Sequence, residues 1–272
     1  MATRTFDVMT ALATADSDFG TMLRTWRATR RMSQLELASA AGVSSRHLSF
    51  IETGRSRPSR EMVVHLAEQL DIPLRERNTL LNAAGFAPIY RETALTAPEM
   101  EQARKAIELV LRQHPYPAVA VDRRWDLVDA NDQAMAFVDG IDPALLGPPL
   151  NVYRVSVHPD GLRPRLVNFD EYADHLLSRL QHQVAVSADP ELIDLLEEIR
   201  ELIGRRHPHV HMSPSQVLLP MRVRAGDQVL SLMSTISVFG TPVDITLAEL
   251  AIEMFFPADA ATAAYLSANG AH

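Results

Sequence analysis

The stretch SQLELASAAGVSSRHLSFIETGRSRPS, Ser33–Ser59, decides the fold of the first part of this chain. Ser33 and Glu36 have the spacing of a capping box, in which each residue satisfies the backbone of the other at the start of a helix. The spacing therefore predicts a helix over Gln34–Ala41. Gly42 follows directly, and glycine readily adopts the left-handed conformation that ends helices.

A second short helix follows this turn. Ser44 is a favourable N-cap residue and predicts a helix over roughly Ser45–Thr53, which Gly54 ends. Two short helices joined by a three-residue turn are typical of a helix-turn-helix motif. The apolar residues that fit the packing of these two helices are Leu37, Ala38, Val43, Leu48 and Ile51.

Three further helices complete a five-helix, all-α unit. Apolar residues from Phe19 to Trp26 recur at helical spacing and predict a helix that ends near Arg31. Cap and proline signals predict the other two helices over residues 60–70 and 74–85. We therefore expect an all-α domain over residues 16–85, followed by a linker over residues 86–98.

Charge is distributed unevenly along the chain. The 272 residues carry a formal net charge of -8, yet the window Gly20–Arg60 holds eight arginines and two glutamates. That window is +6, so the remainder is -14. Such an asymmetry favours one part that binds a polyanion, joined to a part that repels it. A solvated basic helix surface is the alternative interpretation of the charge alone.

The second predicted helix of the motif has the composition of a DNA-recognition helix. Arg46 can pair with both acceptors of a guanine, and Arg55 and Arg57 can hold the flanking phosphates. Gln34 begins the preceding helix, where it can reach a phosphate. Phe50 either contacts a thymine methyl group or packs. The predicted DNA-binding residues are Gln34, Ser44, Ser45, Arg46, Ser49, Phe50, Arg55 and Arg57.

The second half of the chain reads as a mixed α+β domain over residues 99–267. Strand patterns predict one hairpin with strands at residues 118–121 and 125–128, and another with strands at residues 216–223 and 228–238. Thr246 and Glu249 have capping-box spacing and predict a last helix that ends at Phe255–Pro257. The elements do not alternate as βαβ units, so a dinucleotide-binding fold is not expected.

Two resemblances extend this interpretation. The segment Ser33–Ser59 resembles the xenobiotic-response-element type of helix-turn-helix found in phage-repressor-like proteins. PYPAVAVDRRWDLVDAN (115–131), HPDGLRPRLVNFDEY (158–172) and FGTPVDITLAELAIEMFFPADAAT (239–262) resemble segments of regulators with an MmyB-like domain. The resemblance implies a multidomain transcription regulator: an all-α repressor-like domain, then an α+β, PAS-like domain that binds a small, fatty-acid-like ligand.

A fatty-acid-like ligand needs an apolar cavity and a cation or donor for its carboxylate. We expect Arg163 and Arg165, close to Asn168 and Tyr172, to form the polar end of such a site. The residues predicted to line its apolar part are Trp125, Phe137, Leu176, Phe239 and Phe256. The alternative is that these aromatic residues simply form the core.

No metal site or catalytic set is expected. His207, His209 and His211 would share one face of a strand, but Pro208 and Pro214 favour a solvated loop. The chain contains no cysteine. It shows no phosphate-binding loop and no nucleophile with a matching base. We therefore predict a protein that is not an enzyme and needs no cofactor.

The sequence as a whole predicts a cytoplasmic, sequence-specific transcription regulator. It shows neither a signal peptide nor an apolar run long enough to span a membrane. The expected partners are a double-stranded DNA operator, a second copy of the chain and a small-molecule effector. Two alternatives stay open: a second domain that binds a protein partner without a small ligand, or an enzyme fused to a DNA-binding module.

Overall fold

The computed structural model describes residues 18–204 and 219–269. The chain divides into two compact units. The first contains the chain up to Glu92 together with His182–Ile193 and Val243–Ile245, and the second contains the rest. An all-α N-terminal region followed by an α+β region confirms the predicted fold class.

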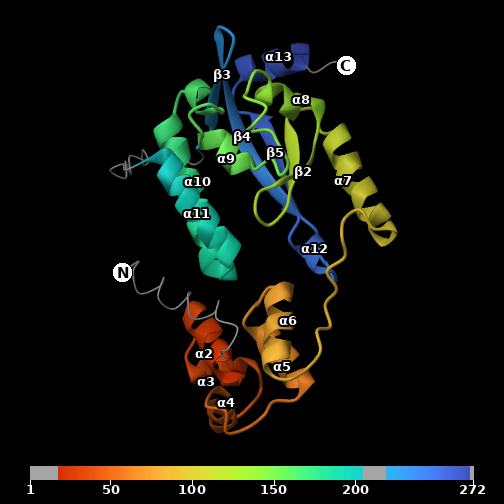
Figure 1. Ribbon diagram of the computed structural model, residues 1–272, viewed down its shortest axis with the longest axis vertical. Helices are drawn as coiled ribbons and strands as arrows, with labels where there is room; N and C mark the ends of the chain where they lie inside the picture. The colour runs from red at the N-terminus through yellow and green to blue at the C-terminus, as the bar shows by residue number, and fades with distance from the viewer. Residues whose placement is uncertain (1–17, 205–218, 270–272) are drawn as a thin grey trace. The chain divides into compact units, whose positions relative to one another are not determined.

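The first unit contains the five predicted helices (Figure 1). Three of them begin after serine N-caps, whose hydroxyl groups accept hydrogen bonds from the first turn. Their bounds are α2 Phe19–Thr29, α3 Gln34–Ala40, α4 Ser45–Glu52, α5 Arg60–Gln69 and α6 Leu74–Ala83. The fully buried core contains Leu23, Trp26, Leu37, Leu48, Ile51, Leu66 and Leu80.

Two glycines set the packing of these helices. Gly42 has a φ of 64°, so it makes the predicted left-handed turn between α3 and α4. Gly20 permits a close approach of α2 to α4, because a Cβ atom there would lie 2.6 Å from the backbone oxygen of Glu52. A larger residue at Gly20 would therefore push these two helices apart.

The second unit is built around a five-stranded antiparallel sheet of order β2-β1-β5-β4-β3. The strands are β1 Ala118–Val121, β2 Leu127–Ala130, β3 Met221–Ala225, β4 Gln228–Val238 and β5 Ala251–Pro257. The α-helices in this part of the chain are α7 Glu101–Gln113, α8 Asp132–Met135, α9 Val152–Val157, α10 Phe169–Ser187, α11 Pro190–Ile203, α12 Ile245–Ala248 and α13 Ala260–Asn269. The end of α10, the start of α11 and the first residue of α12 are the parts of these helices that belong to the first unit. Short 3-10 turns are η1 Pro98–Met100, η2 Ala136–Val138 and η3 Arg163–Arg165.

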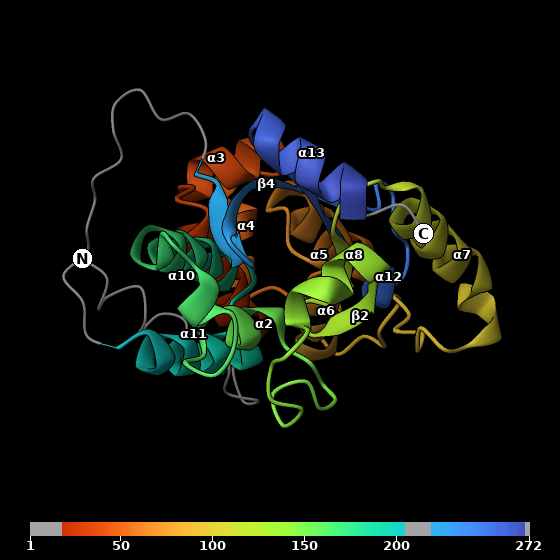
Figure 2. The ribbon, with the colours of Figure 1, turned by 90° about the horizontal axis from the view of Figure 1, so that it is seen from above.

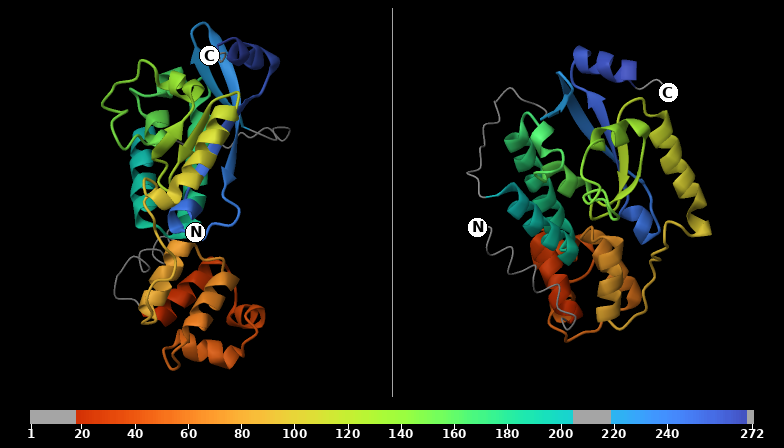
Figure 3. Two further views of the ribbon diagram at one scale, coloured as in Figure 1. Left: turned by 90° about the vertical axis from the view of Figure 1, so that its right-hand side faces the viewer. Right: turned by 45° about the horizontal axis from the view of Figure 1, so that its top comes forward.

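Helices cover both faces of this sheet. Ile107 and Leu111 of α7 pack against Ala118, Ala120 and Ile252 on one face. The α10–α11 pair lies on the opposite side from α7 (Figure 2). Helices α12 and α13 lie at opposite ends of the sheet (Figure 3). The side that carries α8, α9 and α10 is the side on which a cavity forms.

The predicted last helix is wrong beyond its first turn. Only Ile245–Ala248 is helical, and Ala251–Pro257 forms the central strand β5. In a strand, alternate side chains point to opposite faces, so Ile252 packs towards α7 while Glu253 faces the cavity. This segment becomes a strand because it pairs with both β1 and β4, which the local spacing does not show.

Each predicted hairpin is right in one strand, Ala118–Val121 and Gln228–Val238, and shifted in the other. The return strand of the first begins at Leu127 and not at Trp125, because Trp125 has a φ of 66° and belongs to the turn. In the second hairpin, β3 spans Met221–Ala225. The predicted start of that strand, at residues 216–218, lies outside the described part of the chain.

Candidate functional sites

The outer face of α4 is polar and its inner face is apolar. Leu48 and Ile51 are buried, whereas Ser45 and Arg46 are exposed near the N-terminus of the helix. Ser44 caps the helix by accepting a hydrogen bond of 3.1 Å from the backbone nitrogen of His47. The helix therefore presents short polar groups and one cation to solvent.

Arg46 and Phe50 form a stacked pair on this face. The guanidinium carbon of Arg46 lies 5.3 Å from the ring centroid of Phe50, one helical turn further on. Phe50 and its neighbour Ser49 are both only partly exposed. This contact holds the Arg46 guanidinium on the helix surface, and contact of Phe50 with a thymine methyl group stays a prediction.

The arginines in and around the helix-turn-helix are used in two different ways. Arg46, Arg55 and Arg57 are exposed and make no ion pair with any of the described residues. Arg24 and Arg30 instead donate to backbone carbonyl oxygens, at 2.8 Å in both cases. Some arginines between Gly20 and Arg60 thus hold the fold together. The three exposed arginines lie on α4 or just after it.

Glu52, at the end of α4, is the buried anchor of this structural group. It accepts hydrogen bonds from Arg27 Nε at 2.7 Å, Arg27 Nη2 at 3.0 Å and Gln34 Nε2 at 2.8 Å. Burial raises the pKa of this carboxyl, but the bonds from Arg27 and Gln34 outweigh burial and hold the pKa below its usual value. The side chain of Gln34 was predicted to reach a phosphate, but in the structure its amide nitrogen donates to Glu52 within the domain.

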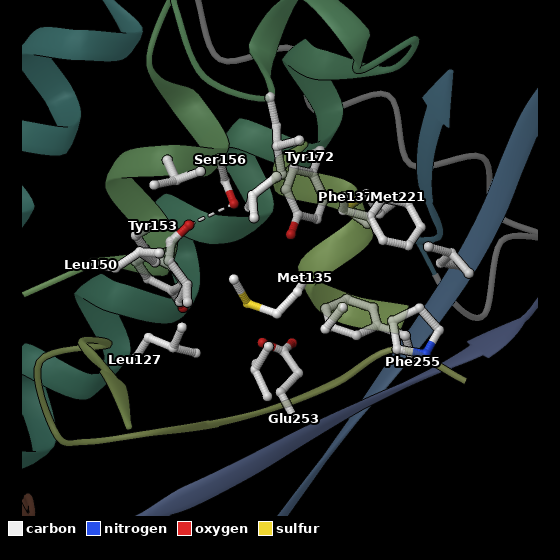
Figure 4. Close-up of a pocket in the computed structure, with 18 residues that line it drawn as sticks. Leu127, Met135, Phe137, Leu150, Tyr153, Ser156, Tyr172, Met221, Glu253 and Phe255 are labelled. Atoms are coloured by element: carbon white, nitrogen blue, oxygen red, sulfur yellow. Dashed lines mark hydrogen bonds between the residues drawn. The ribbon is translucent and has the colours of Figure 1, made fainter. Parts of the chain in front are cut away.

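The second unit contains a partly open, largely apolar cavity of about 90 Å³ between the sheet and the helices α8 to α10 (Figure 4). Phe137, Met221 and Phe255 are among its apolar walls. Met135, whose side chain is flexible, also lines it and is 41% exposed. The remaining apolar lining is Pro117, Val119, Leu127, Ala134, Val138, Leu150, Val152, Val155, Leu162 and Leu232.

Four polar residues also line the cavity: Tyr153, Ser156, Tyr172 and Glu253. In Figure 4 the hydroxyl of Tyr172 and the carboxylate of Glu253 both point towards its middle, from opposite sides. Ser156 donates a hydrogen bond of 2.7 Å to the backbone oxygen of Val152. The cavity thus has an apolar wall and one polar region, the combination found in small-molecule sites.

A buried stack supports the polar region from behind. Arg179 of α10 donates to Glu253 Oε1 at 3.0 Å and lies 4.1 Å over the ring of Trp125. Trp125 in turn stacks on Tyr153, with ring centroids 4.5 Å apart and 12° between the planes. The hydroxyl of Tyr153 and Nη2 of Arg179 are both buried without a hydrogen-bond partner. Burial raises the pKa of the Tyr153 hydroxyl, which therefore stays protonated.

The aromatic residues predicted to line a ligand site fall into three places. Phe137 and Tyr172 line the cavity, and Trp125 lies directly behind Tyr153. Phe239 packs with the cluster on the α7 face of the sheet. Phe256 contacts His114, with ring centroids 4.9 Å apart, because it points away from the cavity at its position in β5. Leu176 is buried but is not part of the lining.

Of the polar residues predicted for a carboxylate, Tyr172 lines the cavity, whereas Arg163, Arg165 and Asn168 do not. Arg163 donates to the backbone oxygen of Leu202, and Arg165 to that of Phe137. Asn168 donates to the backbone oxygen of Pro220, just before β3, and accepts from the backbone nitrogen of Arg222 within β3. These side chains bond backbone carbonyl and amide groups in and beside α11, η2 and β3, so their polar groups are used within the fold.

Sequence reasoning included Tyr172 but missed the other residues that form the polar region. Glu253 left a signal, because it is a lone acid within the otherwise apolar run AIEMFFP. Such an acid is costly to bury and so points to a partner or a function. Arg179 and Tyr153 left no comparable signal, since both lie on amphipathic helices where polar residues are usual.

Neither a metal site nor a membrane span is found within residues 18–204 and 219–269. That part of the chain holds no cluster of three or more potential metal-binding side chains. Nor does any helix there have the length and apolar character needed to cross a bilayer. His207, His209 and His211 lie outside the described residues.

The helix-turn-helix unit and the apolar cavity together indicate the class of a DNA-binding transcription regulator with a separate ligand-binding domain. Residues 18–80 match the family described as helix-turn-helix domain, and residues 103–268 match that of the MmyB-like transcription regulator ligand binding domain. The chain therefore belongs to the MmyB-like transcription regulators. Both are regulatory families and not enzyme families. No curated protein matches the chain.

Proposed function

We propose that this chain is a sequence-specific regulator in which α4 reads base edges in the major groove of an operator. The observation that carries this proposal is the exposed guanidinium of Arg46, supported by Phe50 and lacking an anionic partner among the described residues. A cation near the N-terminus of a recognition helix has the geometry for bidentate pairing with guanine. Arg55 and Arg57, just after this helix, would bind the flanking phosphates.

The regulator is proposed to act as a homodimer in the cytoplasm. One helix of eight residues contacts few bases, and two half-sites about one helical turn apart would increase both affinity and specificity. The negative charge outside the motif would weaken non-specific attraction to DNA. A five-stranded antiparallel sheet with a cavity under α8, α9 and α10 supports a PAS-like sensor in the second unit.

The cavity is proposed to hold a small, largely apolar effector. Its lining is mostly aliphatic and aromatic, and two buried polar atoms beside it lack partners. A volume of about 90 Å³ is small, so an acyl chain would enter only if flexible side chains such as Met135 moved. The effector controls DNA binding if it binds the DNA-competent and incompetent forms unequally.

Substitution of arginines tests the DNA-binding proposal. Arg46→Ala is expected to weaken operator binding by about 1–3 kcal/mol and to relax base preference at one position. Arg55→Ala, as the matched control, is expected to weaken binding to all sequences alike and to lower the salt slope by about one unit. Titration of operator and random DNA at several salt concentrations measures both effects. Equal losses on both DNAs for Arg46→Ala would exclude Arg46 from base recognition.

Native mass spectrometry tests the assembly and the effector together. We expect twice the chain mass plus a bound molecule that is lost on denaturation. A dimer of bare chain mass that also fails to bind small apolar probes would instead favour a second domain that binds a protein partner.

A further inference from the structure

The surface of α7 is divided into three stripes with the same helical spacing. Residues that are four, three and four positions apart lie on one side of a helix. One stripe is buried in the second unit and includes Ala103, Ile107 and Leu111. The second, the charged stripe, consists of Glu101, Lys105, Glu108 and Arg112. The third, the uncharged stripe, consists of Gln102, Ala106, Leu109 and Gln113.

The uncharged stripe is open to solvent, at the edge of the second unit (Figure 1). Leu109 is 61% exposed, and Val110 beside it is 37% exposed. Single exposed apolar residues are common, but the solvated side of a helix normally carries charged groups. Here alanine, leucine and valine lie in the middle, with a glutamine at each end. An apolar centre without charge and with a polar rim is the composition of a protein–protein contact.

The order of charges in the charged stripe selects the partner. The signs alternate along the helix, because the stripe runs from Glu101 through Lys105 and Glu108 to Arg112. Two copies of α7 that pack antiparallel about a two-fold axis bring the start of one helix beside the end of the other. Glu101 then lies beside Arg112 of the second copy, and Lys105 lies beside its Glu108. A parallel pair would place each charge beside the same charge, which is unfavourable.

The uncharged stripe fits the same antiparallel arrangement. Its centre lies between residues 107 and 108, and that of the charged stripe lies between residues 106 and 107. The two centres therefore differ by about 1.5 Å along the helix. Ala106 lies opposite Leu109 of the second copy, so a small residue meets a large one, as in packed helices. Gln102 lies opposite Gln113, where each amide is both donor and acceptor.

We propose that α7 forms the contact between two copies of this chain, with the helices antiparallel and the uncharged stripes facing each other. This inference rests on the proposed homodimer and assigns its surface. One helix from each copy makes a small interface, so the dimer is expected to dissociate at low protein concentration.

Sedimentation of the full-length protein over a range of concentrations tests this surface. Leu109→Glu places two carboxylates in the contact and is expected to raise the dissociation constant of the dimer about tenfold or more. Val238→Glu changes a valine of β4 that is 64% exposed, and as the matched control it should leave that constant unchanged. Unchanged dimerisation of Leu109→Glu would overturn the assigned surface but leave the homodimer intact. A wild-type protein that is monomeric at every concentration would overturn the homodimer, and this surface with it.

Introduced thiols report the direction of the helices, because the chain contains no cysteine. Chains with Gln102→Cys are mixed with chains with Gln113→Cys under oxidising conditions. We expect disulfide-linked dimers in the mixture, because the antiparallel pair brings these two positions together. Gln102→Cys alone should not cross-link, since its two copies would lie about 16 Å apart along the helices. Cross-linking of Gln102→Cys alone, and not of the mixture, would show a parallel pair and overturn the proposal. If Leu109→Glu fails to fold, this experiment decides the question.

Reversal of charge tests the pairing of the two charged stripes. Lys105→Glu places a carboxylate beside Glu108 of the second copy and is expected to raise the dissociation constant about threefold. Glu108→Lys, added to the same chain, restores opposite signs and should return the constant to the wild-type value. The same sedimentation series measures both variants. A second change that brings no recovery would show that the charged stripes do not meet, which would overturn the antiparallel arrangement.

Discussion

The two units each bury one glutamate against an arginine, but they satisfy it to different degrees. Glu52 accepts three hydrogen bonds, two from Arg27 and one from Gln34, and its side chain is fully enclosed. Glu253 accepts one hydrogen bond, from Arg179, whose Nη2 has no partner. Buried polar networks are stable when every member is satisfied and costly when one is not.

The difference indicates two different uses of a buried carboxylate. The saturated site at Glu52 joins α2, α3 and α4, and so keeps the recognition helix at a defined position. The unsaturated site at Glu253 faces a cavity, where an incomplete set of hydrogen bonds can be completed by a ligand. A buried carboxylate with an incomplete set of hydrogen bonds therefore marks a candidate binding site, whereas one with a complete set marks a structural ion pair.

The largest effect is expected at Glu52. Glu52→Gln leaves the buried guanidinium of Arg27 without its counter-charge and should lower the free energy of unfolding of the first unit by about 3–5 kcal/mol. Denaturant unfolding followed by tryptophan fluorescence measures this. Trp26 and Trp125 are the two tryptophans of the chain, one in each unit, so a background with Trp125→Phe reports the first unit. A loss below about 1 kcal/mol would show that the network is not saturated in solution.

A smaller effect is expected at Glu253. Glu253→Gln removes one charged hydrogen bond but keeps an oxygen that can accept from Arg179, so we expect a loss of about 1–2 kcal/mol in the second unit. The same experiment in a Trp26→Phe background, with Trp125 as reporter, measures it. A loss as large as that for Glu52→Gln would remove the distinction between the two sites.

The smallest effect is expected in mild acid, and only in the first unit. The pKa of Glu52 is lowered in the folded state, although burial alone would raise it, because the bonds from Arg27 and Gln34 favour the charged form. A lowered pKa adds stability above the unfolded value, near 4.5, and that stability is lost as the pH falls through the folded value. The Trp26-monitored stability should therefore decline as the pH drops below about 4.5. Glu52→Gln should flatten this decline, and an equally steep decline in that variant would assign it to other carboxylates.

Much of the first unit could be predicted from the sequence, and much less of the second. The serines before α3, α4 and α5 and the turn at Gly42 act within a few residues, so local spacing contains the information. The exposed position of Arg46 follows from the same spacing. The hydrogen bonds from Arg27 and Gln34 to Glu52 could not be predicted from local spacing, because they depend on how three helices meet.

The sequence by itself determined the class of this protein: a helix-turn-helix with exposed arginines, joined to an acidic α+β domain. Only the tertiary structure decided where the ligand cavity lies and which groups form its polar end. Glu253 reaches the cavity because Ala251–Pro257 becomes a strand between β1 and β4, partners distant in the sequence. A helix is formed by hydrogen bonds four residues apart, whereas a strand needs neighbours that only the folded chain provides.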